Sequence, residues 1–415
     1  MTIHPDTQSL PTAAQIPLQT FHLPPFPREA SNLKHLTLTS DIKPTDYADL
    51  LAAATTTTQD DAVPAVPPTL PTGIQSLTLE LFSLGYPAPF LTHLGKALPA
   101  LKDLTLYSHL IDGVSDASRR DAADFIHGAL AGLHSKNEGG DTSTGGLREL
   151  HLLDVFCRKG FIAGIGDILH DLEDRKRALR LLEVSYTYRG HSDGEFLDRI
   201  PVQELPGLLV GGLVGVSLRL EAAAAAAAAA DASSQAGLEG MPDDPADIDE
   251  NGERATKKPE GIVPVGSAHE GTRLLVERLG GIGTGDEVES ESESGLKMLD
   301  CTLYALSLEQ LASVLRRQRR LAVLSVSVLV SEGQHAKRGL WETLRLGGEQ
   351  LEVVEVVGVP GPEGNYVTDS GKSEDLFRDM FPTSSDMLAL AAALPHLESF
   401  SMTILRAPAL GLFLG

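Results

Sequence analysis

The stretch of this sequence that most resembles a catalytic motif is Gly371-Lys372-Ser373, which follows the apolar segment 351–357 and precedes a helix-like run. A phosphate-binding loop needs a strand, the pattern GxxxxGK[ST] and a helix, so that backbone N–H groups and the lysine surround the phosphate. Tyr366 occupies the position of the first glycine. The simpler interpretation is a surface loop in which Ser373 caps a helix. A nucleotide-binding enzyme that uses this loop stays as the alternative hypothesis.

Other catalytic and metal-binding patterns are missing from the sequence. The 13 histidines show neither HxH nor helical HxxxH spacing, and Cys157 and Cys301 have no cysteine partner nearby, so we expect no metal site. The glycines at 281, 283 and 285 follow a helix-like segment, whereas a dinucleotide-binding loop follows a strand. We therefore predict no catalytic residue, no cofactor and no enzymatic activity.

The charge of the chain limits its partners. The formal net charge of −23 argues against general binding to nucleic acids or anionic membranes, since both need cationic contacts. The longest apolar stretch, 205–218, is too short and too rich in glycine to span a bilayer. Two cysteines without a pairing pattern, and an N-terminus that does not resemble a signal peptide, are typical of a reducing compartment. We expect a soluble cytoplasmic or nuclear protein.

The strongest regularity in the chain is an apolar triplet with the spacing LxxLxL, which recurs ten times, usually after a helix-like segment. Chance matches are common in a chain that is 42% hydrophobic, so the argument rests on the repeated order of helix and triplet. This order predicts alternating helices and short parallel strands, and it places Cys301, in a third slot, in the core. A doubly wound α/β domain would show a similar alternation. The ten triplets begin at Leu33, Ile74, Leu101, Leu147, Leu179, Leu213, Leu296, Leu321, Leu351 and Leu397.

With these triplets, the chain resembles the leucine-rich repeat family over about residues 30–405, outside the insertions. The closest likeness is to the irregular, longer repeats of ribonuclease-inhibitor-like and F-box-associated proteins. The resemblance implies an α/β solenoid with parallel strands on the concave side and helices on the convex side. It also implies a protein partner, for which a ubiquitin-ligase adaptor is one candidate. The chain departs from the family in two ways. It lacks an F-box motif. It also lacks the usual Asn or Cys three residues after the third apolar residue of each triplet; His109 and Val155 occupy this position in two repeats.

Shifts in composition divide the chain into repeat-bearing and low-complexity regions. Residues 221–266 open with nine alanines and continue as an acidic tract, which is typical of a disordered insertion. The predicted regions are an extended Pro-rich leader (1–30), N-terminal repeats (31–220) with disordered loops near 52–72 and 136–146, the insertion (221–266) and C-terminal repeats (267–415).

The residues between the apolar slots predict a binding surface, because alternate side chains of a strand point to opposite faces. In the middle of the chain these positions carry mixed charge and tyrosine, which is typical of protein-binding surfaces. An ordinary solvated sheet face with ion pairs is the alternative. The predicted binding residues are Lys102, Asp103, Tyr107, Arg148, Glu149, His151, Asp154, Arg180, Glu183 and Tyr186.

The end of the chain predicts a second contact surface. A repeat array needs a polar cap, yet an apolar tail containing Leu410, Leu412, Phe413 and Leu414 follows the last triplet. We therefore expect self-association through this C-terminal edge.

Overall fold

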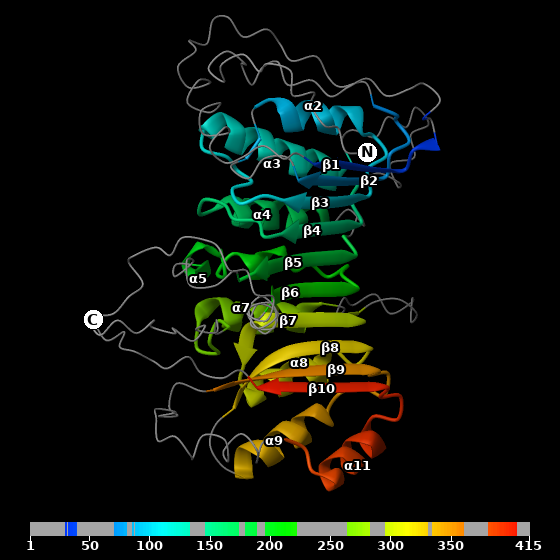
Figure 1. The fold of residues 1–415 in the computed structure, drawn as a ribbon, viewed down its shortest axis with the longest axis vertical. Coiled ribbons are helices and arrows are strands. Elements are labelled where there is room, and N and C mark those ends of the chain that lie inside the picture. Colours follow the sequence, from blue (N-terminus) through cyan, green and yellow to red (C-terminus); the bar gives the residue numbers. More distant parts are fainter. Residues whose placement is uncertain are drawn as a thin grey trace, which may run out of the picture. The chain divides into compact units, whose positions relative to one another are not determined.

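The computed structural model describes twelve parts of the chain, within which strands and helices alternate (Figure 1). Ten strands form one parallel sheet whose strand order follows the sequence, and every predicted triplet lies at one of these strands. The prediction of an α/β fold with parallel strands is therefore confirmed. The described residues are 30, 32–39, 70–80, 85–86, 88–132, 146–173, 179–188, 196–221, 264–282, 295–330, 334–360 and 381–404.

The strands are short, with five to nine residues each. Their bounds are β1 His35–Thr39, β2 Ser76–Glu80, β3 Asp103–Tyr107, β4 Glu149–Leu153, β5 Leu181–Thr187, β6 Gly215–Glu221, β7 Met298–Leu306, β8 Val323–Val330, β9 Val353–Pro360 and β10 Ser399–Ile404. The helices are α2 Phe90–Ala97, α3 Asp116–Ala131, α4 Phe161–Glu173, α5 Phe196–Arg199, α7 Glu270–Gly281, α8 Leu308–Arg317, α9 Gln334–Leu344 and α11 Ser384–Ala393, with a short 3-10 helix, η6, at Leu205–Leu208.

The chain divides into two compact units. Unit 1 comprises Met1–Ser185, Arg199–Ser217 and Arg273–Leu299, and unit 2 comprises Tyr186–Asp198, Leu218–Thr272 and Asp300–Gly415.

The core of unit 1 is built from the apolar slots of the triplets. Strand pairing places Leu77, Leu104, Leu150 and Leu182 side by side on successive strands, and all four side chains are fully buried. The residues between the slots alternate with them and stay partly exposed. Burial of a leucine side chain stabilises a fold by about 1.5–3 kcal/mol, so these apolar ladders hold the strands in register.

The starts of two helices in unit 1, α2 and α4, are capped by acidic side chains from elsewhere in the chain. Helix α2 has no cap of its own, but Asp121 of α3 accepts hydrogen bonds from Leu91 N (2.9 Å) and Thr92 N (3.0 Å). Glu204 does the same for α4, where Gly160 N and Ala163 N donate to its carboxylate at 2.7 and 3.0 Å. A carboxylate at a helix N-terminus satisfies unpaired N–H groups and complements the helix dipole. These bonds therefore tie neighbouring helical layers together.

Unit 2 repeats the same construction with local caps. Helix α8 begins with a capping box in which Ser307 and Gln310 exchange hydrogen bonds, as Thr383 and Asp386 do at α11. Cys301 is fully buried in the third slot of its triplet, which confirms its predicted place in the core.

The predicted boundaries of the insertion 221–266 are wrong at both ends. Glu221 belongs to β6, and Val265 forms a parallel bridge with Tyr304, donating its N–H to Leu303 O and accepting from Ala305 N. These hydrogen bonds extend the pairing of β7, so a buried, β-branched Val265 is part of the fold. Residues 222–263 lie outside the described residues.

Several other predicted regions also lie outside the described residues, wholly or in large part. They are the leader 1–30, the loops 52–72 and 136–146, Gly371-Lys372-Ser373 and the C-terminal tail. At the last strand, the slot residues Phe400 and Met402 are only half-buried, and Leu388 on α11 is 72% exposed. Self-association through this edge stays a prediction.

None of the helices in the described part of the chain combines the length and the hydrophobicity that crossing a bilayer requires.

Candidate functional site

Four of the predicted binding residues lie on the exposed face of β3, β4 and β5. The pairing sets Asp103 beside Glu149, and it sets Thr105, His151 and Glu183 in a row across the three strands. We call these five residues the sheet face. All five residues are half-buried, so each leaves part of its surface accessible.

His151 is held between two glutamates on the sheet face. Its Nδ1 lies 2.6 Å from Glu183 Oε2, and its Nε2 lies 3.7 Å from Glu149 Oε2. The His151 and Glu183 side chains are 20% and 34% exposed, so the contact is partly shielded from solvent. A short contact of this kind fixes both side chains in one orientation and makes the surface rigid.

Among the acids of the sheet face, Asp103 lies in an environment that disfavours its ionised form. Burial, followed by repulsion from Glu149, raises the pKa of the Asp103 carboxyl, while His151 and Lys102 act in the opposite direction. A partner that brings a positive charge to Asp103 and Glu149 would relieve this repulsion.

Tyr107 and Asp154 lie beyond the ends of the triplets and have a structural contact with each other. The Tyr107 hydroxyl is 3.2 Å from Asp154 Oδ2, and Asp154 is only 5% exposed. Asp154 has a positive φ of 48° and donates its N–H to Ser185 O, so it turns the chain at the end of β4. Tyr107 therefore stays a half-buried candidate for binding, and Asp154 orients it.

The prediction that Tyr186 lies on the binding surface is wrong, because its side chain is completely buried. Burial alternates along β5 without a break, so the position two residues after Val184 faces the core. The Tyr186 ring meets Phe196 edge to face, with 6.4 Å between ring centres. Tyr186 thus continues the apolar ladder by one slot.

A different surface, formed where the strands begin at their N-terminal ends, carries Lys102, Arg148 and Arg180. Each immediately precedes a strand, and its carbonyl oxygen accepts two N–H groups from the following strand segment; Lys102 O, for example, accepts from Arg148 N (2.7 Å) and Glu149 N (3.2 Å). The sequence predicted these residues as part of one binding surface with Asp103, Glu149 and Glu183. The structure assigns them to a hydrogen-bonded row of their own.

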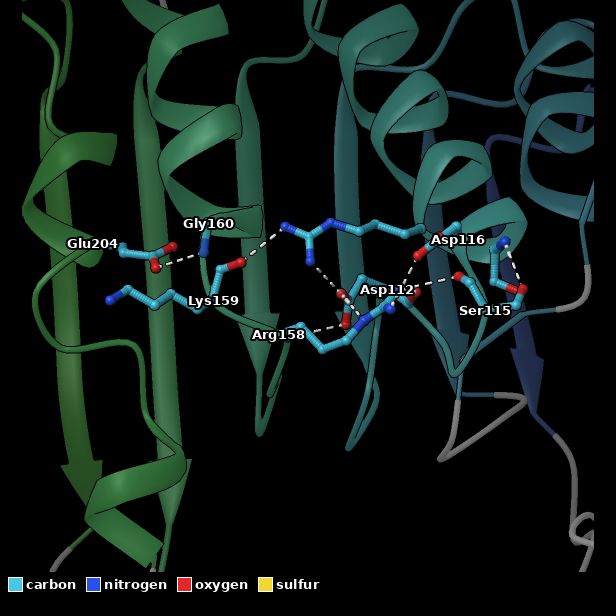
Figure 2. Close-up of polar contacts among 9 residues, drawn as sticks. Asp112, Ser115, Asp116, Arg158, Lys159, Gly160 and Glu204 are labelled. Carbon is cyan, nitrogen blue, oxygen red and sulfur yellow. Dashed lines mark hydrogen bonds and ion pairs between the residues drawn. The ribbon is translucent and has the colours of Figure 1, made fainter.

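The densest polar cluster of unit 1 lies at the opposite ends of the strands and was missed by sequence reasoning. Figure 2 shows the side chain of Arg158, from the loop after β4, beside Asp112 and Ser115, in the loop after β3. Arg158 Nε donates to Asp112 Oδ2 at 2.9 Å, and its Nη2 donates to the carbonyls of Asp112 and Ser115, each at 3.1 Å. Arg119 adds an ion pair to Asp112 at 3.5 Å. We call Asp112, Arg119 and Arg158 the loop latch.

The loop latch is structural rather than reactive. Asp112 is fully buried, and its carboxylate is enclosed by Arg158, from the loop after β4, and by Arg119 of α3, so no substrate group could reach it. Nearby, burial together with Asp112 and Glu204 raises the pKa of Cys157 to about 12. A thiol with such a pKa stays protonated near neutral pH and is a poor nucleophile.

Two features of the described residues bear on the binding of ions and small molecules. They contain no group of three or more His, Cys, Asp or Glu side chains placed to bind a metal. A cavity of about 10 Å³ between α2 and α3 is lined by small residues such as Gly95 and Gly128. That is room for about one water molecule, whereas ligand pockets measure about 300–1,000 Å³.

No protein-family model matches this chain, and no curated protein sequence matches it.

Proposed function

We propose that this protein is an irregular leucine-rich repeat solenoid that binds another protein through the sheet face and catalyses no reaction itself. The observation that supports this most is the fixed geometry of charged side chains on rigid strands, above all His151 between Glu149 and Glu183. Strands paired in register set the positions of these side chains, so little side-chain entropy is lost when a partner docks.

The composition of the sheet face also suits a protein partner. Acidic side chains and His151 share the exposed face of the strands with half-buried Tyr107, and aromatic side chains with polar tips are frequent anchors of protein interfaces. The family resemblance adds the concave placement of the strands and makes a ubiquitin-ligase adaptor one candidate partner. Both belong to the proposal.

Site-specific photo-cross-linking tests the proposed function. A photoreactive amino acid replaces Thr105, in the middle of the sheet face, and a control replaces Arg120, which is exposed on α3. The proposal predicts a discrete cross-linked protein from position 105 in an extract of the cells that produce the protein, and none from position 120. Adding Glu183→Lys to the position-105 protein should abolish the adduct, because it reverses a charge of the face. Equal adducts from both positions, or none from position 105, would contradict the proposal.

A further inference from the structure

The row of residues that precedes the strands of unit 1 is predominantly basic. Its backbone is continuous: the carbonyl oxygen of each residue from Lys34 to Val214 accepts two N–H groups from the next strand segment, at 2.7–3.3 Å, and the last of these segments begins with Lys297. We call this row the edge row. In order across the sheet it consists of Lys34, Gln75, Lys102, Arg148, Arg180, Val214 and Lys297.

Five of these seven residues are basic in a chain whose net charge is −23, and four of the five are exposed. Within the described residues, Lys102, Arg148 and Lys297 form no ion pair with a neighbour. Their charges are therefore available to a partner.

The fold itself does not require basic residues at these positions. The same backbone pattern recurs in unit 2, where Ala322 and Glu352 each accept two N–H groups from the next strand segment. A basic side chain near the C-terminus of a preceding helix complements the helix dipole. That effect would apply in both units, yet Glu352 stands at an equivalent position in unit 2. The basic run is specific to unit 1.

The spacing of the edge row suits an extended chain that crosses the strands. Neighbouring strands lie about 4.8 Å apart, so the four intervals from Lys34 to Arg180 span about 19 Å, and the six intervals to Lys297 span about 29 Å. An extended polypeptide rises about 3.3 Å per residue. About six to nine residues of a partner would cover the row, with an acidic side chain within reach of each basic one.

The acids of the sheet face offset this row only in part, since Lys102 contributes the least of the groups that shift the pKa of Asp103. Lys102 and Asp103, like Arg148 and Glu149, are consecutive residues, and consecutive side chains leave an extended backbone in opposite directions. The two signs of charge are thus separated into an edge and a face. A long polyanion such as a nucleic acid, which would extend beyond the edge, would meet repulsion from Asp103, Glu149 and Glu183.

We propose that the edge row of unit 1 docks an acidic, extended polypeptide segment of about six to nine residues, rich in Asp and Glu. This deepens the proposed function, because the segment would belong to the protein partner that contacts the neighbouring sheet face. Carboxylates of the segment would pair with Lys102, Arg148 and the other basic residues of the edge row. The same complementary charge would align the segment along the edge row.

Fluorescence anisotropy with the full chain tests this inference. The probe is a labelled peptide of about nine residues in which Glu alternates with Ala, and the matched control peptide has Gln in place of Glu. We expect the Glu peptide to bind at least about tenfold more tightly than the Gln peptide, with affinity that falls as salt rises. Lys102→Glu combined with Arg148→Glu should weaken binding at least about tenfold. Lys96→Glu with Arg120→Glu, which changes the net charge equally on exposed helix positions, should change it less than about twofold.

The outcomes separate this inference from the proposed function. Equal binding of the Glu and Gln peptides, equal loss in both double variants, or tighter binding of a single-stranded nucleic acid of similar length would overturn the edge-row assignment. If the adduct from position 105 forms and the Lys102→Glu, Arg148→Glu variant leaves it unchanged, the sheet face binds a partner without the edge row. Peptide binding that depends on the edge row, without any adduct from position 105, would instead contradict the proposed function.

Discussion

Removal of the buried Asp112 carboxylate from the loop latch should lower the free energy of unfolding by an amount that can be worked out from its contacts. Asp112→Ala removes the acceptor of Arg158 N (3.1 Å) and Arg158 Nε (2.9 Å), and it removes the ion pair with Arg119 at 3.5 Å. A hydrogen bond to a charged group contributes about 1.5–3 kcal/mol. The Arg158 and Arg119 side chains are 36% and 30% exposed, so water replaces part of what they lose. We expect a loss of about 2–4 kcal/mol in the free energy of unfolding.

Asp116→Ala is the matched control, because Asp116 pairs with the same arginine at 3.4 Å but its side chain is 90% exposed. An exposed ion pair contributes at most about 0.5–1 kcal/mol, so this variant should change stability little. Urea unfolding followed by circular dichroism compares the two variants. Repeat proteins do not always unfold in one step, so hydrogen exchange at the Ile111 and Arg158 amides supplies a local measurement. Both amides bond across the two loops and should exchange faster in Asp112→Ala. Equal effects of the two substitutions would refute the assignment of Asp112 as the buried centre of the latch.

Four further predictions address the core, the helix ends and the titrating groups. Leu104→Asp should unfold adjacent repeats, at a cost of several kcal/mol for a buried charge, whereas Thr78→Asp on the opposite face should be mild; similar melting temperatures would disprove the register. Asp121→Ala removes both acceptors at the start of α2 and should lower the free energy of unfolding by about 2 kcal/mol in urea titrations. Folding raises the pKa of Asp103, so the folded state binds its proton more tightly, and stability falls as pH rises from the unfolded value of 3.8 through the raised folded value. Asp103→Asn should therefore stabilise the protein at pH 7 and not below pH 3.8, and a gain of equal size at both pH values would contradict the shift. Cys157, whose pKa is raised to about 12, should react with iodoacetamide at pH 8 at least about 100-fold more slowly in the folded chain than in urea, as measured by mass spectrometry.

The sequence predicted the strands well because their signal is local and strong. Each LxxLxL triplet has two apolar residues two positions apart, and the paired strands bury these as ladders such as Leu104 beside Leu150. The same reasoning failed at Tyr186, where the ladder extends one slot beyond the triplet, and a tyrosine is not recognisable as a core residue by type. Val265 was missed because its pairing with Tyr304 depends on a partner 39 positions away.

The loop latch and the helix caps could not be predicted because they depend on contacts between distant parts of the chain. Arg158 lies 46 residues from Asp112, and Glu204 lies 44 residues from Gly160. No periodic pattern relates such pairs; only the stacking of one strand–helix unit on the next brings them together. The sequence predicted charged side chains at the exposed strand positions, but the separation of these side chains into an edge and a face follows from the parallel register and from the carbonyl oxygens of the edge row.

This separation has a consequence for how the protein can change without losing its fold. The edge row is held by backbone hydrogen bonds that any non-proline residue can make, and the sheet face by apolar slots on its opposite side. Side chains at both surfaces are thus free to vary while the ladders and the loop latch maintain the backbone. Glu352 in unit 2 and Arg148 in unit 1 occupy equivalent backbone positions with opposite charge, which shows that the fold accepts either sign. On our proposal, the basic character of the edge row in unit 1 serves contact with an acidic partner, since stability of the backbone does not demand it.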